Sequence, residues 1–187
     1  MSRHGSSDSV YLRMRLILIC NQTWKEEASM QLLTILNAIE SIENSVADLY
    51  EWCSDCFGHD PEASGVFFRL AMQEKTHAAM VTFSKSLVRK SPNDFTAIDF
   101  DMSLVDDLLD SIATFRYENP KPSLEQALDF AIAIEGHAAE GLHRSMVIQS
   151  NPEVANMINN LAKADLEHLR LLRDFSERIQ RQIPATG

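Results

Sequence analysis

Two segments that lie far apart in the chain carry the same pattern of acidic and histidine residues. The first is Leu-Ala-x-x-Glu74-x-x-His77, and the second is Leu-Ala-x-x-Asp165-x-x-His168. Residues three apart share one face of a helix, so each segment offers a carboxylate oxygen and an imidazole nitrogen to one metal ion. The two segments therefore predict a pair of metal-binding positions.

A glutamate precedes each segment by nearly the same number of residues, Glu43 before the first and Glu135 before the second. This repetition indicates that one helical hairpin is used twice. Each glutamate falls within an apolar stripe, as Glu43 does between Ile39 and Val46, and the two segments fall on such stripes in the same way. All six polar side chains are therefore predicted to point toward the core.

Four carboxylates that point into an apolar interior repel one another and lose their hydration. Two divalent cations cancel four carboxylate charges, so a binuclear metal site removes this conflict. The predicted metal ligands are Glu43, Glu74, His77, Glu135, Asp165 and His168. The alternative is a metal-free bundle in which the acids are protonated or bridged by water.

These ligands require four long helices, and apolar residues at spacings of three and four predict them. The first helix covers about residues 29–57, and Gly58 ends it. Asp60 and Pro61 supply an N-cap and a first-turn proline for a second helix that continues to about residue 90. Because the turn is short, these two helices are predicted to be antiparallel neighbours.

The second half of the chain is predicted to form another pair of helices, over about residues 123–149 and 152–182. Residues 92–122 connect the two pairs and contain three prolines. Within this connection, Ser103 and Asp106 predict a capping box that opens a short helix to about Phe115. Two hairpins joined by one long connection are typical of the ferritin-like variant of the four-helix bundle, so the predicted fold class is all-α.

At these residues the chain resembles the rubrerythrin-like branch of the ferritin-like superfamily. The resemblance spans about residues 30–180 and rests on the two Leu-Ala-x-x-acid-x-x-His segments, on Glu135, and on Glu43 with Tyr50 seven residues further on. It implies a non-haem site of two iron ions that reduces peroxide or dioxygen, or oxidises ferrous iron. It also implies a homodimer, and a core position for Tyr50 with its hydroxyl near the metals.

The chain departs from the rubrerythrin pattern at three points. Ala138 stands where rubrerythrin proper carries a further glutamate, and Asp165 stands where the family has a longer glutamate. The chain also has no second Cys-x-x-Cys, so it lacks the rubredoxin iron centre and is expected to need an external electron donor. Because of these departures, the sequence predicts metal binding more directly than peroxidase activity. Manganese or zinc would suit the same ligands as iron.

Composition excludes some partners and predicts a compartment. The 187 residues carry a formal charge of −10, which disfavours nucleic acid and anionic membranes as partners. No apolar run approaches the roughly 20 residues that span a bilayer. Three cysteines are too few for a disulfide framework, so we expect a reducing, cytoplasmic location. Residues 1–26 are expected to be a poorly specified extension of the bundle formed by residues 27–187, with Met14 and Met30 offering later starts.

Two other motifs contain residues that can bind metals, but they are less strongly indicated as functional sites. Cys53-x-x-Cys56 followed by His59 offers three metal ligands or a redox pair, but incidental thiols are the favoured interpretation. Glu140-x-x-His143 has the ligand spacing on a polar helix face, so it is interpreted as a surface pair. Three functions are left open by the sequence: a di-iron oxidoreductase, a non-catalytic protein for metal storage, delivery or sensing, and a metal-free structural bundle.

Overall fold

The computed structural model describes the backbone of residues 7–92, 100–145 and 152–182, with side chains except at 7–26, 138–145 and 182. Within these ranges the chain forms α-helices and no strand. The helices are α1 (Ser7–Cys56), α2 (Pro61–Lys90), α3 (Ser103–Glu118), α4 (Leu124–Ser145) and α5 (Pro152–Gln182). None of these described helices combines the length and the apolar character needed to cross a membrane. The predicted all-α class is confirmed.

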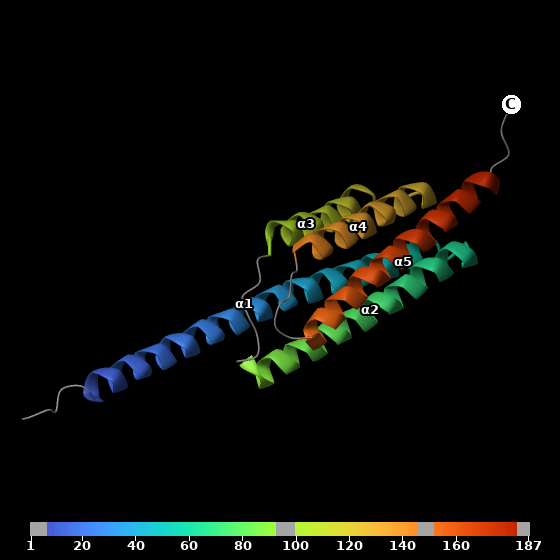
Figure 1. Cartoon of the computed structure of the whole chain (residues 1–187). Helices are drawn as coiled ribbons and strands as arrows, with labels where there is room; N and C mark the ends of the chain where they lie inside the picture. The colour runs from blue at the N-terminus through green and yellow to red at the C-terminus, as the bar shows by residue number, and fades with distance from the viewer. Residues whose placement is uncertain (1–6, 93–99, 146–151, 183–187) are drawn as a thin grey trace, which may run out of the picture.

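The first helix begins much earlier than the sequence pattern predicted. It starts at Ser7 rather than near Ser29, and its N-terminal part projects beyond the other helices (Figure 1). Residues 7–28 contain no glycine or proline, so nothing in the local sequence ends the helix between these two points. Apolar periodicity indicates only the part of a helix that packs against a core, and it therefore missed this extension.

The turn between α1 and α2 forms as predicted. The Asp60 carboxylate accepts hydrogen bonds from the backbone N–H groups of Glu62 at 3.0 Å and Ala63 at 3.1 Å. Pro61 occupies the first turn, where its missing N–H has no helical partner to lose. This cap fixes where α2 starts, and so it fixes the register of Glu74 and His77 relative to α1.

The predicted capping box at Ser103 is wrong. The Asp101 carboxylate accepts hydrogen bonds from the Ser103 backbone N–H at 3.0 Å and from its hydroxyl at 2.7 Å, so the acid upstream of Ser103 replaces the one downstream. A capping box does form at the start of α4. There the Ser123 N–H donates to Gln126 Oε1 at 2.8 Å, and the Gln126 N–H donates to Ser123 Oγ at 3.1 Å.

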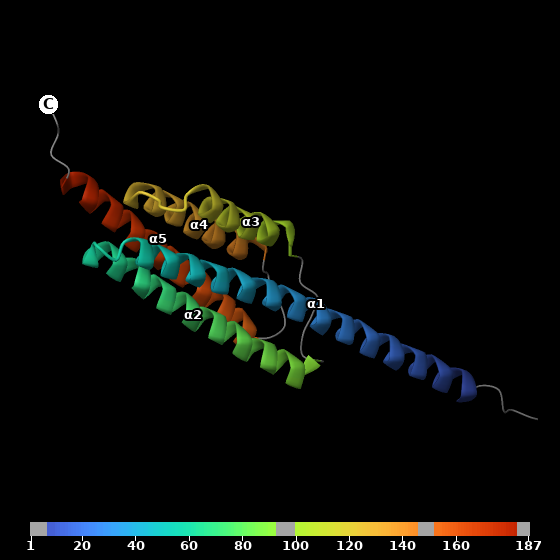
Figure 2. The same ribbon diagram turned by 180° about the vertical axis from the view of Figure 1, so that it is seen from behind.

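The long helices pack in pairs, α1 against α2 and α4 against α5, and α2 also contacts α5. Helix α3 lies beside α1 and α4, as both ribbon views show (Figures 1 and 2). Buried apolar side chains form two clusters at different levels along these helices. The first contains Leu49, Phe67, Leu70, Leu128 and Phe175 among others, and the second contains Leu32, Leu36, Val81, Val88 and Leu161 among others. On α2 and α5 the predicted ligands lie between the two clusters in sequence, whereas on α1 Glu43 lies among residues of the first cluster, between Ile42 and Val46.

Candidate metal centre

Four helices bring six buried polar side chains to the middle of the molecule. Helix α1 supplies one of them, α4 another, and α2 and α5 two each. Each is between 2% and 9% exposed to solvent, so the predicted inward orientation is confirmed. The six residues are Glu43, Glu74, His77, Glu135, Asp165 and His168. Ionisable groups are rarely buried to this extent unless they are paired or bind a metal.

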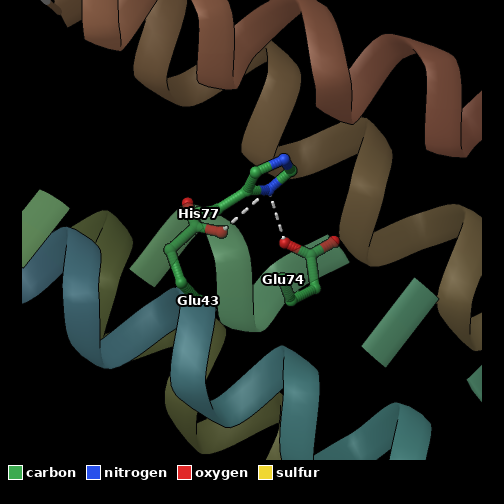
Figure 3. Close-up of side chains that lie close together, drawn as sticks. All are labelled: Glu43, Glu74 and His77. Carbon is green, nitrogen blue, oxygen red and sulfur yellow. Dashed lines mark hydrogen bonds and ion pairs between the residues drawn. The ribbon is translucent and has the colours of Figure 1, made fainter. Parts of the chain in front are cut away.

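One group of ligand atoms joins α1 to α2. Glu43, Glu74 and His77 each place one ligand atom within 4.8 Å of the others. The Nδ1 atom of His77 lies 2.9 Å from Glu74 Oε2 and 3.4 Å from Glu43 Oε2, and Figure 3 shows both carboxylates turned toward the same edge of the imidazole. Two carboxylates and one imidazole make a donor set that suits iron, manganese or zinc.

A second group of the same composition joins α2 to α4 and α5. It contains Glu74, Glu135 and His168, again with one ligand atom from each within 4.8 Å of the others. The Nδ1 atom of His168 lies 2.7 Å from Glu74 Oε1 and 3.5 Å from Glu135 Oε1. Glu74 thus belongs to both groups and directs a different oxygen toward each histidine. A carboxylate placed in this way can bridge two metal ions.

The two histidines that mark the groups lie next to each other. The rings of His77 and His168 stack with their centroids 5.4 Å apart and their planes inclined by 18°. One ring comes from α2 and the other from α5, so the stack spans the contact between the two helical pairs. The two groups are therefore adjacent parts of one centre.

Three atoms at this centre are buried without a hydrogen-bond partner: Glu74 Oε1, His168 Nδ1 and Asp165 Oδ2. The first two are only 2.7 Å apart, so they are close enough for a hydrogen bond but do not have its angular geometry. Unsatisfied buried polar atoms are rare and destabilising. Ligand atoms that converge without aligning on each other have the geometry expected when both are directed at a common cation. The residues present therefore fit a metal centre.

The three glutamates of the two ligand groups differ in how readily their carboxyl groups ionise. Burial by itself raises the pKa of Glu74, but its contacts with His168 and His77 outweigh burial and hold that pKa at about 2. Burial raises the pKa of Glu43 well above its usual value, and it raises that of Glu135 too, with the charge of Glu74 adding to both shifts. The shared carboxylate is thus the one that stays ionised, and its two neighbours are pushed toward the protonated form.

The pKa values of both histidines are raised by the carboxyl groups that face them. Burial alone lowers the pKa of an imidazole, but the facing carboxyls of Glu43 and Glu74 raise that of His77 to about 10. Glu135 and Glu74 act in the same way on His168, whose pKa is also about 10. When no cation is bound, these carboxyl neighbours therefore favour the protonated form of both rings.

Asp165 is the predicted ligand that completes neither group. Its side chain is buried, and its Oδ2 atom has no hydrogen-bond partner, yet it lies outside both sets of converging ligand atoms. Burial, together with the nearby charges of Glu135 and Glu74, raises its pKa to about 7. Aspartate is one methylene shorter than glutamate, so its carboxylate reaches less far from α5 than a glutamate at this position would.

Replacement of Asp165 by glutamate is expected to strengthen binding at the second group, because the longer side chain extends the carboxylate toward His168. Ligand geometry has to be held to within about 0.5 Å, so one methylene is a decisive change. Titration of ferrous iron into the wild-type protein should give two unequal binding steps, and in Asp165→Glu the steps should converge. Two equal steps in the wild-type protein, or loss of metal from the variant, would show that reach is not limiting.

Tyr50 lies beside the second group. It is fully buried, and its hydroxyl donates a hydrogen bond to Glu135 Oε1 at 2.6 Å. Burial raises the pKa of the phenol well above its usual value, and the neighbouring charge of Glu135 adds to this shift. Tyr50 therefore lies next to a predicted ligand, and the Glu135 oxygen that accepts its hydrogen bond, Oε1, is the same oxygen that faces His168 Nδ1.

The Cys53-x-x-Cys56 motif does not join this centre in the described part of the structure. Cys53 and Cys56 are free thiols, and neither they nor His59 belong to a converging set of ligands within the described residues. Burial raises the pKa of Cys53 to about 12 and also raises that of Cys56. Glu140 and His143 have side chains outside the described part of the structure, as does Ala138.

Sequence reasoning identified the six buried side chains and the short reach of Asp165, but not the sharing of Glu74 between the two groups. The spacing of Glu74 matches that of Asp165, so the pattern treats the two as equivalent, whereas only Glu74 belongs to both ligand groups. The spacing of the two segments carries no signal for this sharing. Comparison of the chain with models of protein families, with curated proteins and with solved structures finds no match to any of them, so the arguments for its function come from this geometry.

Proposed function

We propose that the chain is a ferritin-like four-helix bundle that binds two metal ions between α1, α2, α4 and α5, with α3 inside the connection between the two helical pairs. The observation that carries the proposal is the pair of carboxylate and histidine groups that share Glu74. A buried cluster of this kind is an expensive feature for a purely structural bundle, because its charges must be neutralised. Two divalent cations neutralise it with the ligands already in place.

We infer that the metal is iron and that the protein is an oxidoreductase of the rubrerythrin and ferritin type. Mixed carboxylate and imidazole ligands suit ferrous and ferric iron, although manganese and zinc share this preference. A bound pair of iron ions supplies two electrons for the reduction of peroxide or dioxygen, or accepts ferrous iron as the substrate to be oxidised. The electrons for repeated turnover come from a donor outside the metal centre.

The protein's own residues hold and insulate this centre. Glu74 faces both histidines and would hold the two metal positions relative to each other, and the stacked His77 and His168 rings would each supply a nitrogen ligand. Tyr50 orients Glu135 through its hydrogen bond, and its phenol is placed to give or take a proton at Glu135 Oε1. The apolar clusters on either side keep bulk water away, which strengthens each electrostatic contact inside.

A second candidate function, non-catalytic binding of metal for storage, delivery or sensing, is supported by Asp165. Because this carboxylate completes neither group, the second position relies on the shared Glu74 in place of a carboxylate of its own from α5. A weaker second position would release its ion more readily, which suits delivery or sensing better than sustained two-electron chemistry.

Metal analysis combined with spectroscopy decides between these functions. We expect protein purified without added metal to carry about two iron ions per chain, and we expect its iron absorption to be restored by peroxide after anaerobic reduction. Zinc in place of iron, with no response to peroxide, would favour the non-catalytic function. Absence of any bound metal, even after reconstitution with ferrous iron, would overturn both.

Metal binding is expected to release protons and to tighten as the pH rises. A metal ligand must be deprotonated, and the pKa values of about 10 for His77 and His168 keep both rings protonated at neutral pH before a cation arrives. Affinity should therefore increase up to roughly tenfold per pH unit for each imidazole proton displaced. Calorimetric titration in buffers of different ionisation enthalpy measures the number released. Binding that is independent of pH between 6 and 9 would contradict the assignment of the histidines.

A further inference from the structure

Three residues that can be oxidised lie at successive turns of α1, on the side of the centre where Tyr50 meets Glu135. They are Tyr50, Cys53 and Cys56, at intervals of three residues. Their exposure increases along the helix: Tyr50 and Cys53 are 0% and 1% exposed, whereas Cys56 is half-buried. The helical rise of 1.5 Å per residue places Cys56 about 9 Å from Tyr50 along the axis. The row thus connects the ligand shell to the surface.

The three side chains share one environment. Tyr50 and Cys53 belong to the same apolar cluster, and Cys56 packs against it. A negative charge on Cys53 would raise the pKa of Tyr50, and one on Cys56 would raise that of Cys53, which shows that each lies within electrostatic reach of the next. Arg116 of α3 acts on both cysteines in the opposite sense. These thiols are therefore close to each other and to the tyrosine that binds Glu135.

The two cysteines are placed where a disulfide can form. Residues three apart on a helix have Cβ atoms about 5–6 Å apart, somewhat more than the ~3.5–4.5 Å of a disulfide. Helix α1 ends at Cys56 and is followed by the turn at Gly58, so only the last helical turn has to tighten. A pair in the middle of a helix would lack this freedom, because both neighbouring turns would hold it.

We propose that Cys53 and Cys56 are a built-in dithiol donor that returns electrons to the oxidised metal centre by way of Tyr50. The two S–H bonds break, one S–S bond forms, and two protons and two electrons are released. The electrons reduce two ferric ions to two ferrous ions, so the step is balanced. Tyr50 relays each electron, and its phenolic proton moves to Glu135 Oε1 and back across the 2.6 Å hydrogen bond.

The burial of Cys53 protects the dithiol from direct oxidation by peroxide. A thiolate rather than a thiol is the nucleophile that peroxide oxidises directly, and the high pKa of Cys53, about 12, keeps that sulfur protonated. Oxidation then depends on the centre rather than on random encounter with an oxidant. The disulfide is reset by two equivalents of an external thiol: the first attacks the half-buried sulfur of Cys56 while the Cys53 sulfur takes up a proton as it leaves, and the second releases Cys56 as a thiol.

This inference depends on the proposed iron centre, and the experiment separates the two. Iron-loaded protein is oxidised, freed of excess oxidant, reduced briefly at its thiols, and then held without oxygen while ferrous iron and free thiols are counted over time. We expect two ferrous ions to appear as two thiols disappear, with a Cys53–Cys56 disulfide found by peptide mass. The double variant Cys53→Ser and Cys56→Ser should bind iron normally and form no ferrous iron.

Cys20→Ser is the matched control, because it removes a cysteine but keeps the pair, and it should behave as the wild-type protein does. Tyr50→Phe, compared with the wild-type protein per bound iron ion, should form the same disulfide more slowly. Ferric iron that persists beside intact thiols, or thiols lost equally fast from iron-free protein, would overturn the dithiol donor while the iron centre stands. Protein that binds no iron at all would overturn the proposed function itself, and the dithiol donor with it.

Discussion

Replacement of Glu74 by glutamine is expected to remove both metal ions from the protein, a larger loss than any other single ligand change should cause. Glu74 is the one carboxylate that belongs to both ligand groups, with one oxygen facing His77 and the other facing His168. Glutamine keeps the shape but loses the negative charge and one ligand oxygen. The loss of affinity at each position should exceed the ~10–100-fold that is typical of removing an outer-shell partner.

Variants of the other two glutamates test each ligand group separately. Glu43→Gln should weaken the group that contains His77, and Glu135→Gln should weaken the group that contains His168, so each should leave about one ion per chain. Glu167→Gln is the matched control, because it removes an exposed acid next to His168 and should keep both ions. Metal content after equilibrium dialysis measures all four proteins. Equal losses in Glu43→Gln and Glu74→Gln would show that Glu74 is not shared.

Ferrous iron added in the absence of oxygen is expected to raise the melting temperature substantially. A ligand that binds only the folded state stabilises it by mass action, by about 2.7 kcal/mol when its concentration is 100 times the dissociation constant. In a protein of this size each kcal/mol corresponds to a shift of about 2–4 °C, so the expected rise is about 5–11 °C. The ligands come from four helices, so the bound ions would hold all four together.

Thermal unfolding followed by circular dichroism measures this shift at several iron concentrations. Glu74→Gln provides the control: its melting temperature should not respond to iron, although its helical content should match that of the wild-type protein. The size of the shift should also decrease as the pH falls below neutrality, because more protons compete for the ligands. A melting curve that does not respond to iron at saturation would mean that the buried cluster binds no cation.

Local sequence determined the helices that carry the centre and the face on which each ligand lies. The cap at Asp60 and Pro61 fixed the start of α2 because the aspartate accepts from N–H groups only two and three residues away. The apolar spacing around Glu43 identified its buried face for a similarly local reason, since the period of a helix is a property of adjacent turns. Residues whose partners lie within a few positions could be predicted without a structure.

The cap of one helix and the start of another were predicted incorrectly from the sequence. Ser103 has acids on both sides, and the helix start chose Asp101 instead of the predicted Asp106. The start of α1 at Ser7 was missed because residues that project beyond the bundle face no helix that would impose an apolar stripe on them. In both cases the sequence pattern was compatible with more than one arrangement.

The sequence by itself determined that six ionisable side chains are buried together, because the repeat and the apolar stripes together require it. Only the tertiary structure decided how they divide: Glu74 joins both ligand groups, Asp165 joins neither, and Tyr50 binds Glu135 from 85 positions away along the chain. The physical reason is that these contacts depend on how far each helix is shifted and rotated against its neighbours. That offset is set by the packing of whole helix faces, and no pattern within one helix records it.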